Sequence, residues 1–381
     1  MESETALKLR CQRDDLLAAI QAADAVVPSN SAKPILINLQ LEARDGRLEV
    51  IATDLQVGLR AIIGRVEVDR PGQAVVPARQ LSGILKESRS GTVAMELARS
   101  AEQSQVQIQL ADGDYQIPAV IGEAFPAVSF FPTDATVVTV PAVRLEEMIR
   151  QTVFAVDKDR TSAVLSGLFL SIGNGELVLA ATDGKVLCEA VERDAAFTGD
   201  PVQAIVPAAT INHLHRILLA TKPDAVQIAF AGKLIFLRIV VGQGGGLQVE
   251  LTSRLVEGNF PPYRNALPAK ANASVAFDAA ELASAVRRTA LMTSNTSRGI
   301  VLTLAAGQAV FSNLNYTNGS ARIPVPCQYA GGATKLGINA QYLGEVLKAY
   351  KSAKIDIEMS KGLIMREPGV TYLIMPISLP N

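Results

Sequence analysis

The sequence predicts an α+β protein built from three similar domains. Three observations support this prediction: the length of the chain, a recurring order of strand and helix signals, and a short motif found twice at one distance from a helix start. The chain has 381 residues, too many for one ordinary domain core. Hydrophobic residues make up 49% of it, which is enough to fill several packed cores.

Each predicted domain begins with a short strand followed by a helix. The helix starts are expected at Gln12, Pro141 and Asp278, after the strand-like stretches LKLRC, VVTV and ASVAF. Apolar residues follow each start four and eight positions later, as Leu16 and Ile20 do in the first domain. This spacing places them on one face of a helix. Proline at a first helical position and aspartate at a cap are both favourable starts.

A second helix is predicted later in each domain. Its starts are Pro77, Pro207 and Asn339, which lie 65, 66 and 61 residues after the first helix starts. Segments of alternating polarity such as INLQLEA and LFLSIG have the period of half-buried strands, and turns such as RDGR and GNGE separate them. The predicted order in each domain is therefore strand, helix, strands, helix, strands.

The repeat length is a third of 381 residues, about 127. A long repeat that mixes strands with helices favours three α+β domains over a short-period solenoid. The connectors FFPTDA and LPAKANA are rich in proline, alanine and polar residues. We therefore expect domains at residues 1–132, 133–270 and 271–381.

Composition argues against several classes of protein. The formal net charge is −1, so nucleic-acid binding would require a local basic surface. The three cysteines are far apart and form no CxxC pair, which argues against a zinc site or a disulfide framework. No apolar run approaches the ~18 residues of a membrane span, and the N-terminus has no signal core. We expect a cytoplasmic protein with no membrane partner.

The motif Ala-Thr-Asp occurs twice and allows two interpretations. Asp54 and Asp183 each lie 42 residues after the first helix start of their domain. They are either turn residues that recur with the domain, or the carboxylates of a hydrolase. The turn interpretation is favoured, because no nearby motif supplies further catalytic groups or metal ligands. The two histidines, His213 and His215, face different sides of a helix. We expect no catalytic residue, no metal and no cofactor.

Basic residues lie in or beside the predicted helices of all three domains. Examples are Arg13 and Arg79 in the first domain, Arg150 in the second and Lys348 in the third. If these helices faced one side, that side would hold phosphates without distinguishing bases. Solvated helix faces are the alternative, and on charge alone they are the simpler interpretation.

Three longer strings carry a resemblance to a known family. They are LAATDGKVL (179–187), SRLVEGNFPPYRNALP (253–268) and TYLIMPI (371–377). In this order they resemble segments of the bacterial DNA sliding clamp, the beta subunit of DNA polymerase III. Shorter matches extend the resemblance over almost the whole chain.

The resemblance implies a DNA clamp fold and a non-catalytic function. Two chains would form a head-to-tail homodimer, a ring around duplex DNA with helices lining the inside and sheets on the outside. The ring would tether the replicative polymerase for processivity and serve as a docking platform for replication and repair proteins. Implied partners are the catalytic subunit of DNA polymerase III, an ATP-using clamp loader and other proteins with a clamp-binding motif. A three-domain scaffold that does not encircle DNA is a further interpretation.

The resemblance also implies two sets of contact residues. Arg13, Lys33, Arg79, Lys158 and Arg160 correspond to DNA-contacting positions or segments. A pocket for a partner peptide, often similar to Gln-Leu-x-Leu-Phe, would be formed by Leu165, Thr182, Gly184, Lys185, Leu187, Pro261, Asn265, Ala266, Leu373, Ile374, Met375, Pro376 and Ile377. At the rim of this pocket, Lys185 and Asn265 depart from the residues that are frequent in the family.

Overall fold

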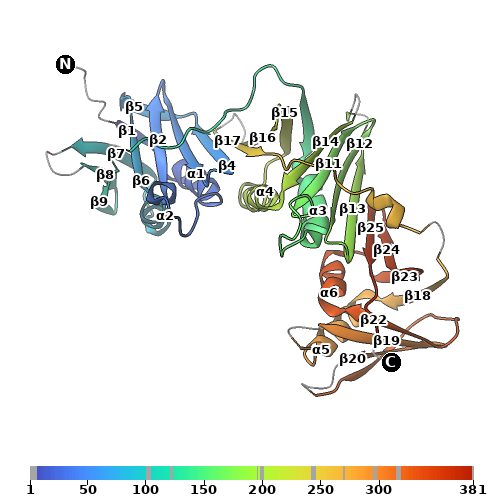
Figure 1. Cartoon of the computed structure of the whole chain (residues 1–381). Coiled ribbons are helices and arrows are strands. Elements are labelled where there is room, and N and C mark those ends of the chain that lie inside the picture. Colours follow the sequence, from blue (N-terminus) through green and yellow to red (C-terminus); the bar gives the residue numbers. More distant parts are fainter. Residues whose placement is uncertain are drawn as a thin grey trace. The chain divides into compact units, whose positions relative to one another are not determined.

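The fold consists of three successive groups of strands and helices with one common order (Figure 1). In this computed structural model, residues 7–99, 104–120, 123–194, 196–197, 201–241, 246–268, 271–294, 298–314 and 319–379 are described. The chain divides into two compact units, one with residues 1–146 and 209–255 and the other with residues 147–208 and 256–381. The prediction of three similar α+β domains is confirmed at the level of the fold.

The first group contains nine strands and two α-helices among its described residues. Its elements are β1 (Lys8–Gln12), α1 (Arg13–Asp24), η1 (Pro34–Ile37), β2 (Asn38–Arg44), β3 (Arg47–Thr53), β4 (Val57–Ile63), β5 (Val66–Arg70), β6 (Gly72–Pro77), α2 (Ala78–Glu87), β7 (Thr92–Arg99), β8 (Ser104–Leu110) and β9 (Gly113–Pro118).

The second and third groups repeat this order without a counterpart of β5. The second has β10 (Val137–Pro141), α3 (Ala142–Thr152), η2 (Val153–Ala155), β11 (Gly167–Gly173), β12 (Glu176–Thr182), β13 (Val186–Arg193), β14 (Val202–Pro207), α4 (Ala208–Thr221), β15 (Ala225–Ala231), β16 (Leu234–Val241), β17 (Leu247–Arg254) and η3 (Tyr263–Ala266). The third has β18 (Ala273–Asp278), α5 (Ala279–Ala290), β19 (Gly299–Ala305), β20 (Gln308–Asn313), β21 (Arg322–Pro326), β22 (Thr334–Asn339), α6 (Ala340–Ala349), β23 (Lys354–Met359), β24 (Leu363–Glu367) and β25 (Val370–Ile374).

Each helix begins one residue after its predicted start. Asp278 is the N-cap of α5, and its side chain accepts hydrogen bonds from the backbone N–H groups of Ala280 and Glu281. Asn339 caps α6 with one such hydrogen bond, from the N–H of Gln341. Pro141 was expected at a first helical position but instead ends β10. Proline is tolerated just before a helix, because the helix needs no N–H group from that residue.

The described strands form four sheets, and every pairing in them is antiparallel. A five-stranded sheet has the order β5-β1-β7-β8-β9, and a four-stranded sheet has the order β21-β20-β19-β22. Two eight-stranded sheets have the orders β10-β15-β16-β17-β4-β3-β2-β6 and β14-β11-β12-β13-β25-β24-β23-β18. Each eight-stranded sheet therefore combines strands of two successive groups.

The pairings β4–β17 and β13–β25 are the junctions between groups. In the first, Val57 lies opposite Ser253 and Ile63 opposite Leu247. In the second, β13 pairs with β25 over five successive residues, from Val186 to Ala190. The strand of each junction that comes from the earlier group follows the Ala-Thr-Asp motif, and its partner is the last strand of the later group. One rule thus joins the first group to the second and the second to the third.

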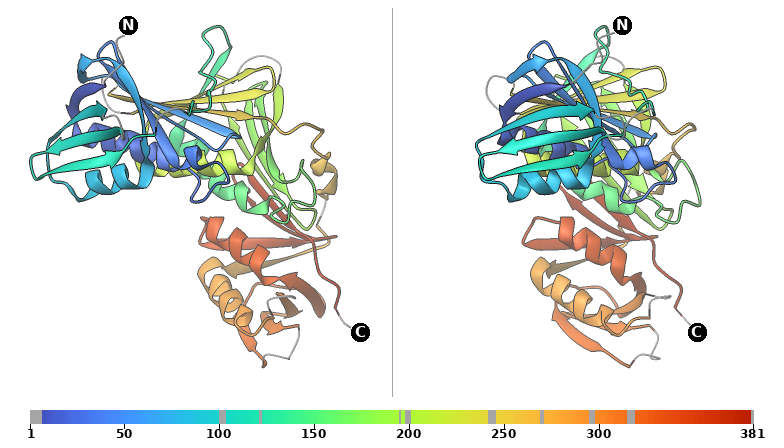
Figure 2. Two further views of the ribbon diagram at one scale, coloured as in Figure 1. Left: turned by 60° about the vertical axis from the view of Figure 1, so that its left-hand side comes forward. Right: turned by 90° about the vertical axis from the view of Figure 1, so that its left-hand side faces the viewer.

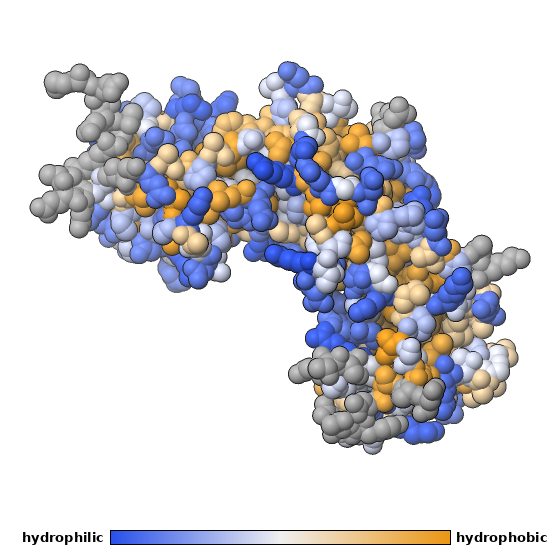
Figure 3. Space-filling model, in the orientation of Figure 1, coloured by the Kyte–Doolittle hydropathy of each residue, from blue (hydrophilic) through white to orange (hydrophobic). Residues whose placement is uncertain are grey.

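The helices bury the apolar faces that the sequence predicted. Leu16, Ile20, Ile149 and Leu282 are at most 1% exposed. Helix α1 contacts β1 and β7 on one side and β3 and β4 on the other, so it fills the layer between two sheets (Figure 2). On the face shown in Figure 3, hydrophobic surface is interrupted by hydrophilic side chains over each group. No described helix is both long enough and apolar enough to cross a membrane.

Two of the three cysteines are buried, as expected for small apolar core residues. Cys11 lies on β1 and Cys188 on β13. Burial raises the pKa of the Cys11 thiol to about 12. Cys327 is partly exposed. The described residues include no disulfide.

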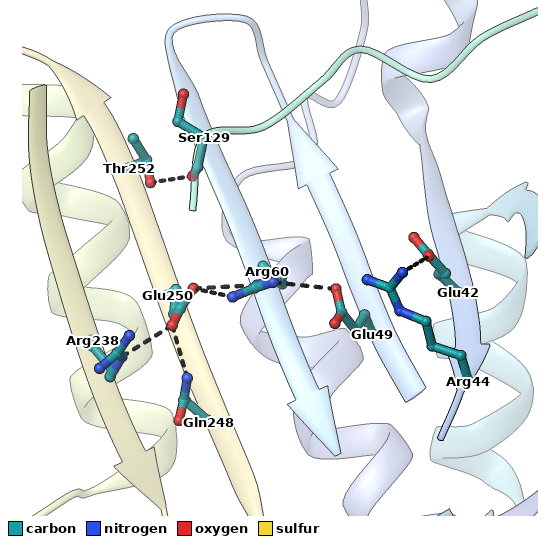
Figure 4. A network of polar contacts seen from close by, with 9 residues as sticks. All are labelled: Glu42, Arg44, Glu49, Arg60, Ser129, Arg238, Gln248, Glu250 and Thr252. Atoms are coloured by element: carbon teal, nitrogen blue, oxygen red, sulfur yellow. Dashed lines mark hydrogen bonds and ion pairs between the residues drawn. The ribbon is translucent and has the colours of Figure 1, made fainter. Parts of the chain in front are cut away.

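A buried glutamate lies at the β4–β17 junction (Figure 4). Glu250 of β17 is 3% exposed. It accepts from Arg60 of β4 at 2.8 Å and from Arg238 of β16 at 3.0 Å. The two guanidinium groups lie over the rings of Phe130 and Phe131 at 4.0 and 3.8 Å. The network therefore fixes the linker between the first two groups onto the sheet that joins them.

Replacing this carboxylate is expected to destabilise the junction. Glu250→Gln removes the charge that pairs with two part-buried arginines, and hydrogen bonds to charged groups contribute about 2 kcal/mol. We expect the thermal midpoint to fall by about 4–8 °C, measured by circular dichroism. Glu176→Gln is the control, because Glu176 pairs with Arg193 at the surface. A change of the same size in the control would contradict the assignment.

Candidate functional site: a cavity beside a repeated turn

The two Ala-Thr-Asp motifs form the same turn. Asp54 Oδ1 accepts from the backbone N–H groups of Gln56 and Val57 at 2.9 and 2.7 Å. Asp183 Oδ1 accepts from those of Lys185 and Val186 at 2.8 and 2.9 Å. In both turns the preceding threonine hydroxyl donates to the carbonyl four residues later, at 2.8 and 2.7 Å. The turn interpretation of the two aspartates agrees with this geometry.

The two turns differ in the residue after the aspartate and in the partner of the second carboxylate oxygen. Leu55 has φ 75° and Gly184 has φ 85°, a region that glycine adopts without strain. Asp183 Oδ2 accepts from the hydroxyl of Tyr342 on α6 at 2.5 Å. Asp54 Oδ2 lies 3.9 Å from Nε2 of His213 on α4. Each turn therefore contacts the second helix of the following group.

Little supports a catalytic or metal site in the described part of the chain. His213 contacts Arg216, whereas His215 contacts Glu146 at 2.8 Å. Burial, with help from Arg216, lowers the pKa of His213. Within the described ranges, no cluster of three or more histidine, cysteine or acidic residues could hold a metal ion. The hydrolase alternative built on Asp54 and Asp183 is not favoured.

A cavity of about 400 Å³ lies next to the second turn. It brings together residues from all three strings that carried the family resemblance. The expected pocket residues that line it are Thr182, Gly184, Lys185, Leu187, Pro261, Asn265, Ala266, Leu373 and Met375.

The floor of this cavity is apolar and its rim is open to solvent. Leu187 and Leu373 lie opposite each other on β13 and β25 and are 4% and 3% exposed. They pack with Ile364, and Tyr263 packs against this cluster. Met375 at the rim is 38% exposed. Such a cavity can take apolar side chains of a ligand.

Four expected pocket residues do not line the cavity, namely Leu165, Ile374, Pro376 and Ile377. Ile374 is fully buried, because side chains alternate along β25 and Leu373 occupies the cavity face. Ile377 donates its N–H to the carbonyl of Gly337 on β22 at 2.9 Å. The backbone carbonyl of Leu165 accepts from the N–H of Asp157 at 2.9 Å.

Sequence reasoning missed three lining residues, Val186, Pro262 and Tyr263. Tyr263 was part of the string FPPY, which was a sufficient signal to include it. Tyr263, Pro261, Pro262 and Asn265 also line a second cavity of about 430 Å³, whose other walls include Phe169. The segment 260–266 therefore stands between two cavities.

The expected DNA-contacting residues differ in how free their side chains are. Arg79 and Lys33 are exposed, and Arg79 donates to the carbonyl of Ser29 at 3.2 Å. The side chain of Arg13 is only 17% exposed, and its guanidinium donates to the carbonyl of Ser88 at the end of α2. Arg13 thus also connects α1 to α2, a role that its position at a helix start did not indicate.

Lys158 and Arg160 lie on an exposed loop after η2. Asp157 shapes this loop by accepting from the Thr161 hydroxyl at 2.6 Å and from the Ser162 N–H at 3.0 Å. These hydrogen bonds lower the pKa of Asp157. The loop therefore presents two basic side chains on an ordered turn.

Comparison with known proteins gives one consistent result. Family models of the DNA polymerase III beta subunit match in succession: the N-terminal domain at residues 7–129, the central domain at 139–262 and the C-terminal domain at 264–378. The beta sliding clamp of Synechococcus elongatus is 27% identical over 98% of this chain and 100% of that protein. That of Pseudomonas putida is 28% identical over 97% and 99%. The crystal structure of DNA polymerase III subunit beta from Pseudomonas aeruginosa has a TM-score of 0.86 at 26% identity, covering 98% and 100%.

The shared turn geometry predicts that matched substitutions destabilise both turns, with the larger effect at Asp183. Asp54→Ala and Asp183→Ala each remove two hydrogen bonds to backbone N–H groups, about 1–2 kcal/mol, and Asp183→Ala also removes the acceptor of the Tyr342 hydroxyl. Asp183→Asn keeps an acceptor and should lose less. Thermal unfolding of the three variants measures these effects. A neutral Asp54→Ala beside a destabilising Asp183→Ala would show that the two turns are not equivalent.

Proposed function

The chain belongs to the DNA polymerase III beta subunit family of sliding clamps, and we propose that it works as a head-to-tail homodimer closed around duplex DNA. The ring would tether the catalytic subunit of the replicative polymerase and offer a docking surface to other proteins of replication and repair. Tethering makes each rebinding of the polymerase an intramolecular event at high effective concentration, which is how a clamp without catalysis raises processivity.

The junction rule of the fold is the observation that carries the homodimer proposal. The earlier group contributes the strand that follows its first hairpin, as β4 and β13 do, and the later group contributes its last strand, as β17 and β25 do. By the same rule the third group offers β21 and the first group offers β9. Both are edge strands of their sheets. The two edges differ, so β21 of one chain would pair with β9 of the other in a heterologous interface. Two such interfaces close a ring of two chains if the rotation between the chains is a half turn.

Exposed basic side chains support the DNA part of the proposal. Lys33, Arg79, Lys158 and Arg160 are exposed, and side chains of this kind bind phosphates without distinguishing bases. We propose these four residues as DNA contacts, with Arg13 as a partial contributor because of its bond to Ser88. Contacts of this kind are salt-dependent and allow sliding.

The 400 Å³ cavity supports the docking part of the proposal. Its apolar floor and open rim suit a peptide of the Gln-Leu-x-Leu-Phe type, with leucine and aromatic side chains as anchors. We propose the cavity-lining residues as peptide contacts. Ile374 is fully buried, so it would support the cavity from the core without contacting the peptide. Leu165, Pro376 and Ile377 remain proposed contacts for parts of a peptide that extend beyond the cavity.

Further parts of the proposal follow from family membership. The protein would have no catalytic activity, would be opened by a clamp loader that uses ATP, and would work in the cytoplasm. We propose domain borders after residues 132 and 270, close to the ends of the matched family domains.

Retention on circular DNA tests the ring. Protein loaded onto a nicked circle by a clamp loader with ATP should stay bound in gel filtration and should leave when the circle is cut once. Equal retention on circular and linear DNA would show that the protein does not encircle DNA. The unloaded protein should have a mass near twice 40.4 kDa by light scattering.

Lysine substitutions on edge strands test which edges form the dimer interface. Tyr115→Lys on β9 and Ile323→Lys on β21 place a charge that opposes pairing of edge strands. Both variants should shift to monomers and lose retention. Val202→Lys on β14, an edge that the rule leaves unpaired, should remain a dimer. Loss of dimers in the Val202 variant alone would contradict the rule.

A charged group at the rim tests the cavity. Met375→Glu should raise the Kd of a fluorescent Gln-Leu-Ala-Leu-Phe peptide about tenfold or more, because an apolar anchor would meet a carboxylate. Fluorescence anisotropy gives the Kd. Leu291→Glu is the control, since Leu291 is 77% exposed and lies outside the cavity. Equal affinity of both variants would rule out this cavity as the peptide site.

A further inference from the structure

One buried carboxylate holds the segment that separates the two cavities. Glu189 of β13 is 8% exposed. Its Oε1 accepts from the hydroxyl of Tyr263 at 2.7 Å and from Nε of Arg264 at 2.6 Å. Burial and the neighbouring Glu189 raise the pKa of Tyr263, so the phenol keeps the proton that it donates. Both donors belong to residues 260–266, hereafter the wall segment.

The strand itself gives little reason for a glutamate at this position. Glu189 lies opposite Ala180 on β12 and Thr371 on β25, in the middle of an eight-stranded sheet. A carboxylate buried there is unfavourable unless charged or hydrogen-bonding groups compensate it. The compensating groups are those of Tyr263 and Arg264. The wall segment is therefore the reason that this carboxylate is tolerated.

The wall segment is held from its other end by aromatic contacts. The ring of Phe260 lies 5.4 Å from that of Phe169 on β11 and 5.9 Å from that of Tyr263. The segment is thus fixed to β11 by Phe260 and to β13 by Glu189. Asn265 and Ala266, which line the 400 Å³ cavity, directly follow the residues that Glu189 holds. They face Leu187 and Leu373 as lining residues of the same cavity.

We infer that Glu189 is a positioning residue for peptide binding, which fixes the width of the cavity through Tyr263 and Arg264 without touching the peptide. The inference rests on the proposed peptide cavity and adds to it the residue that shapes one wall. In Glu189→Gln, Arg264 would lose its ion pair, and Tyr263 would keep only a neutral amide oxygen as the acceptor of its part-buried hydroxyl. The wall would then be free to move, and the peptide would have to order it on binding.

Glu250 offers a matched control elsewhere in the chain. It too is a buried glutamate on a junction strand, in the other compact unit. Its partners, Arg60 and Arg238, come from neighbouring strands of its own sheet rather than from a cavity wall (Figure 4). A general loss of stability should therefore appear in Glu189→Gln and Glu250→Gln alike, whereas a loss of peptide affinity should appear only in the first.

The experiment compares both variants as full-length chains. The Kd of a fluorescent Gln-Leu-Ala-Leu-Phe peptide is measured by anisotropy, and the thermal midpoint is measured on the same samples. We expect Glu189→Gln to raise the Kd about tenfold and Glu250→Gln to leave it unchanged. Tyr263→Phe removes only one donor and leaves the Glu189–Arg264 pair in place. It should raise the Kd by a smaller factor, about threefold.

The outcomes separate this inference from the function on which it rests. An unchanged Kd in Glu189→Gln, or equal changes in Glu189→Gln and Glu250→Gln, would overturn the positioning role while leaving the cavity intact. Failure of the unaltered chain to bind the peptide would overturn the cavity and this role together. If Glu189→Gln does not fold, Tyr263→Phe decides: an unchanged Kd there overturns the inference, and a raised Kd with a normal thermal midpoint supports it.

Discussion

Backbone hydrogen bonding between strands of successive groups is the interaction on which the rest of the structure depends. The pairings β4–β17 and β13–β25 turn four small sheets into two large ones (Figure 1). Ladder hydrogen bonds require no particular side chain, so the three groups could diverge in sequence and still join in one way. The side chains beside each junction were then free to specialise, as Glu250 and Glu189 show.

The repeated turn has the same hydrogen bonds in both copies but different surrounding residues. Asp54 and Asp183 make the same two backbone hydrogen bonds, which explains why the motif recurs with the domain. The second turn borders the 400 Å³ cavity, with Gly184 in place of the strained Leu55, whereas the first turn borders a smaller cavity of about 150 Å³. The carboxylate is structural in both copies, and the functional difference lies in the residues around it.

Much of the fold could be predicted because its signals are local. Period and capping residues placed the helices within one residue of their observed starts, and Leu16 and Ile20 are buried as expected. The cavity was predicted less completely, because it depends on contacts between distant segments. Alternation along TYLIM could have separated Leu373 from Ile374. No local pattern could show that Glu189 is buried, since its partners lie more than seventy residues later in the chain. For the same reason the bond of Arg13 to Ser88 was missed.

The linkers contribute more than their composition suggested. Polar, proline-rich connectors are normally mobile surface loops, yet both linkers dock aromatic residues onto a junction sheet. Phe130 and Phe131 stack against arginines that Glu250 holds, and Tyr263 bonds directly to Glu189. At the second junction this docking also creates a cavity with walls from β12 and β13, the linker and β25. A peptide bound there would contact two groups and the segment that connects them. We expect its affinity to depend on how the linker is attached to the sheet, and Glu189 contributes to this attachment through its hydrogen bonds to Tyr263 and Arg264.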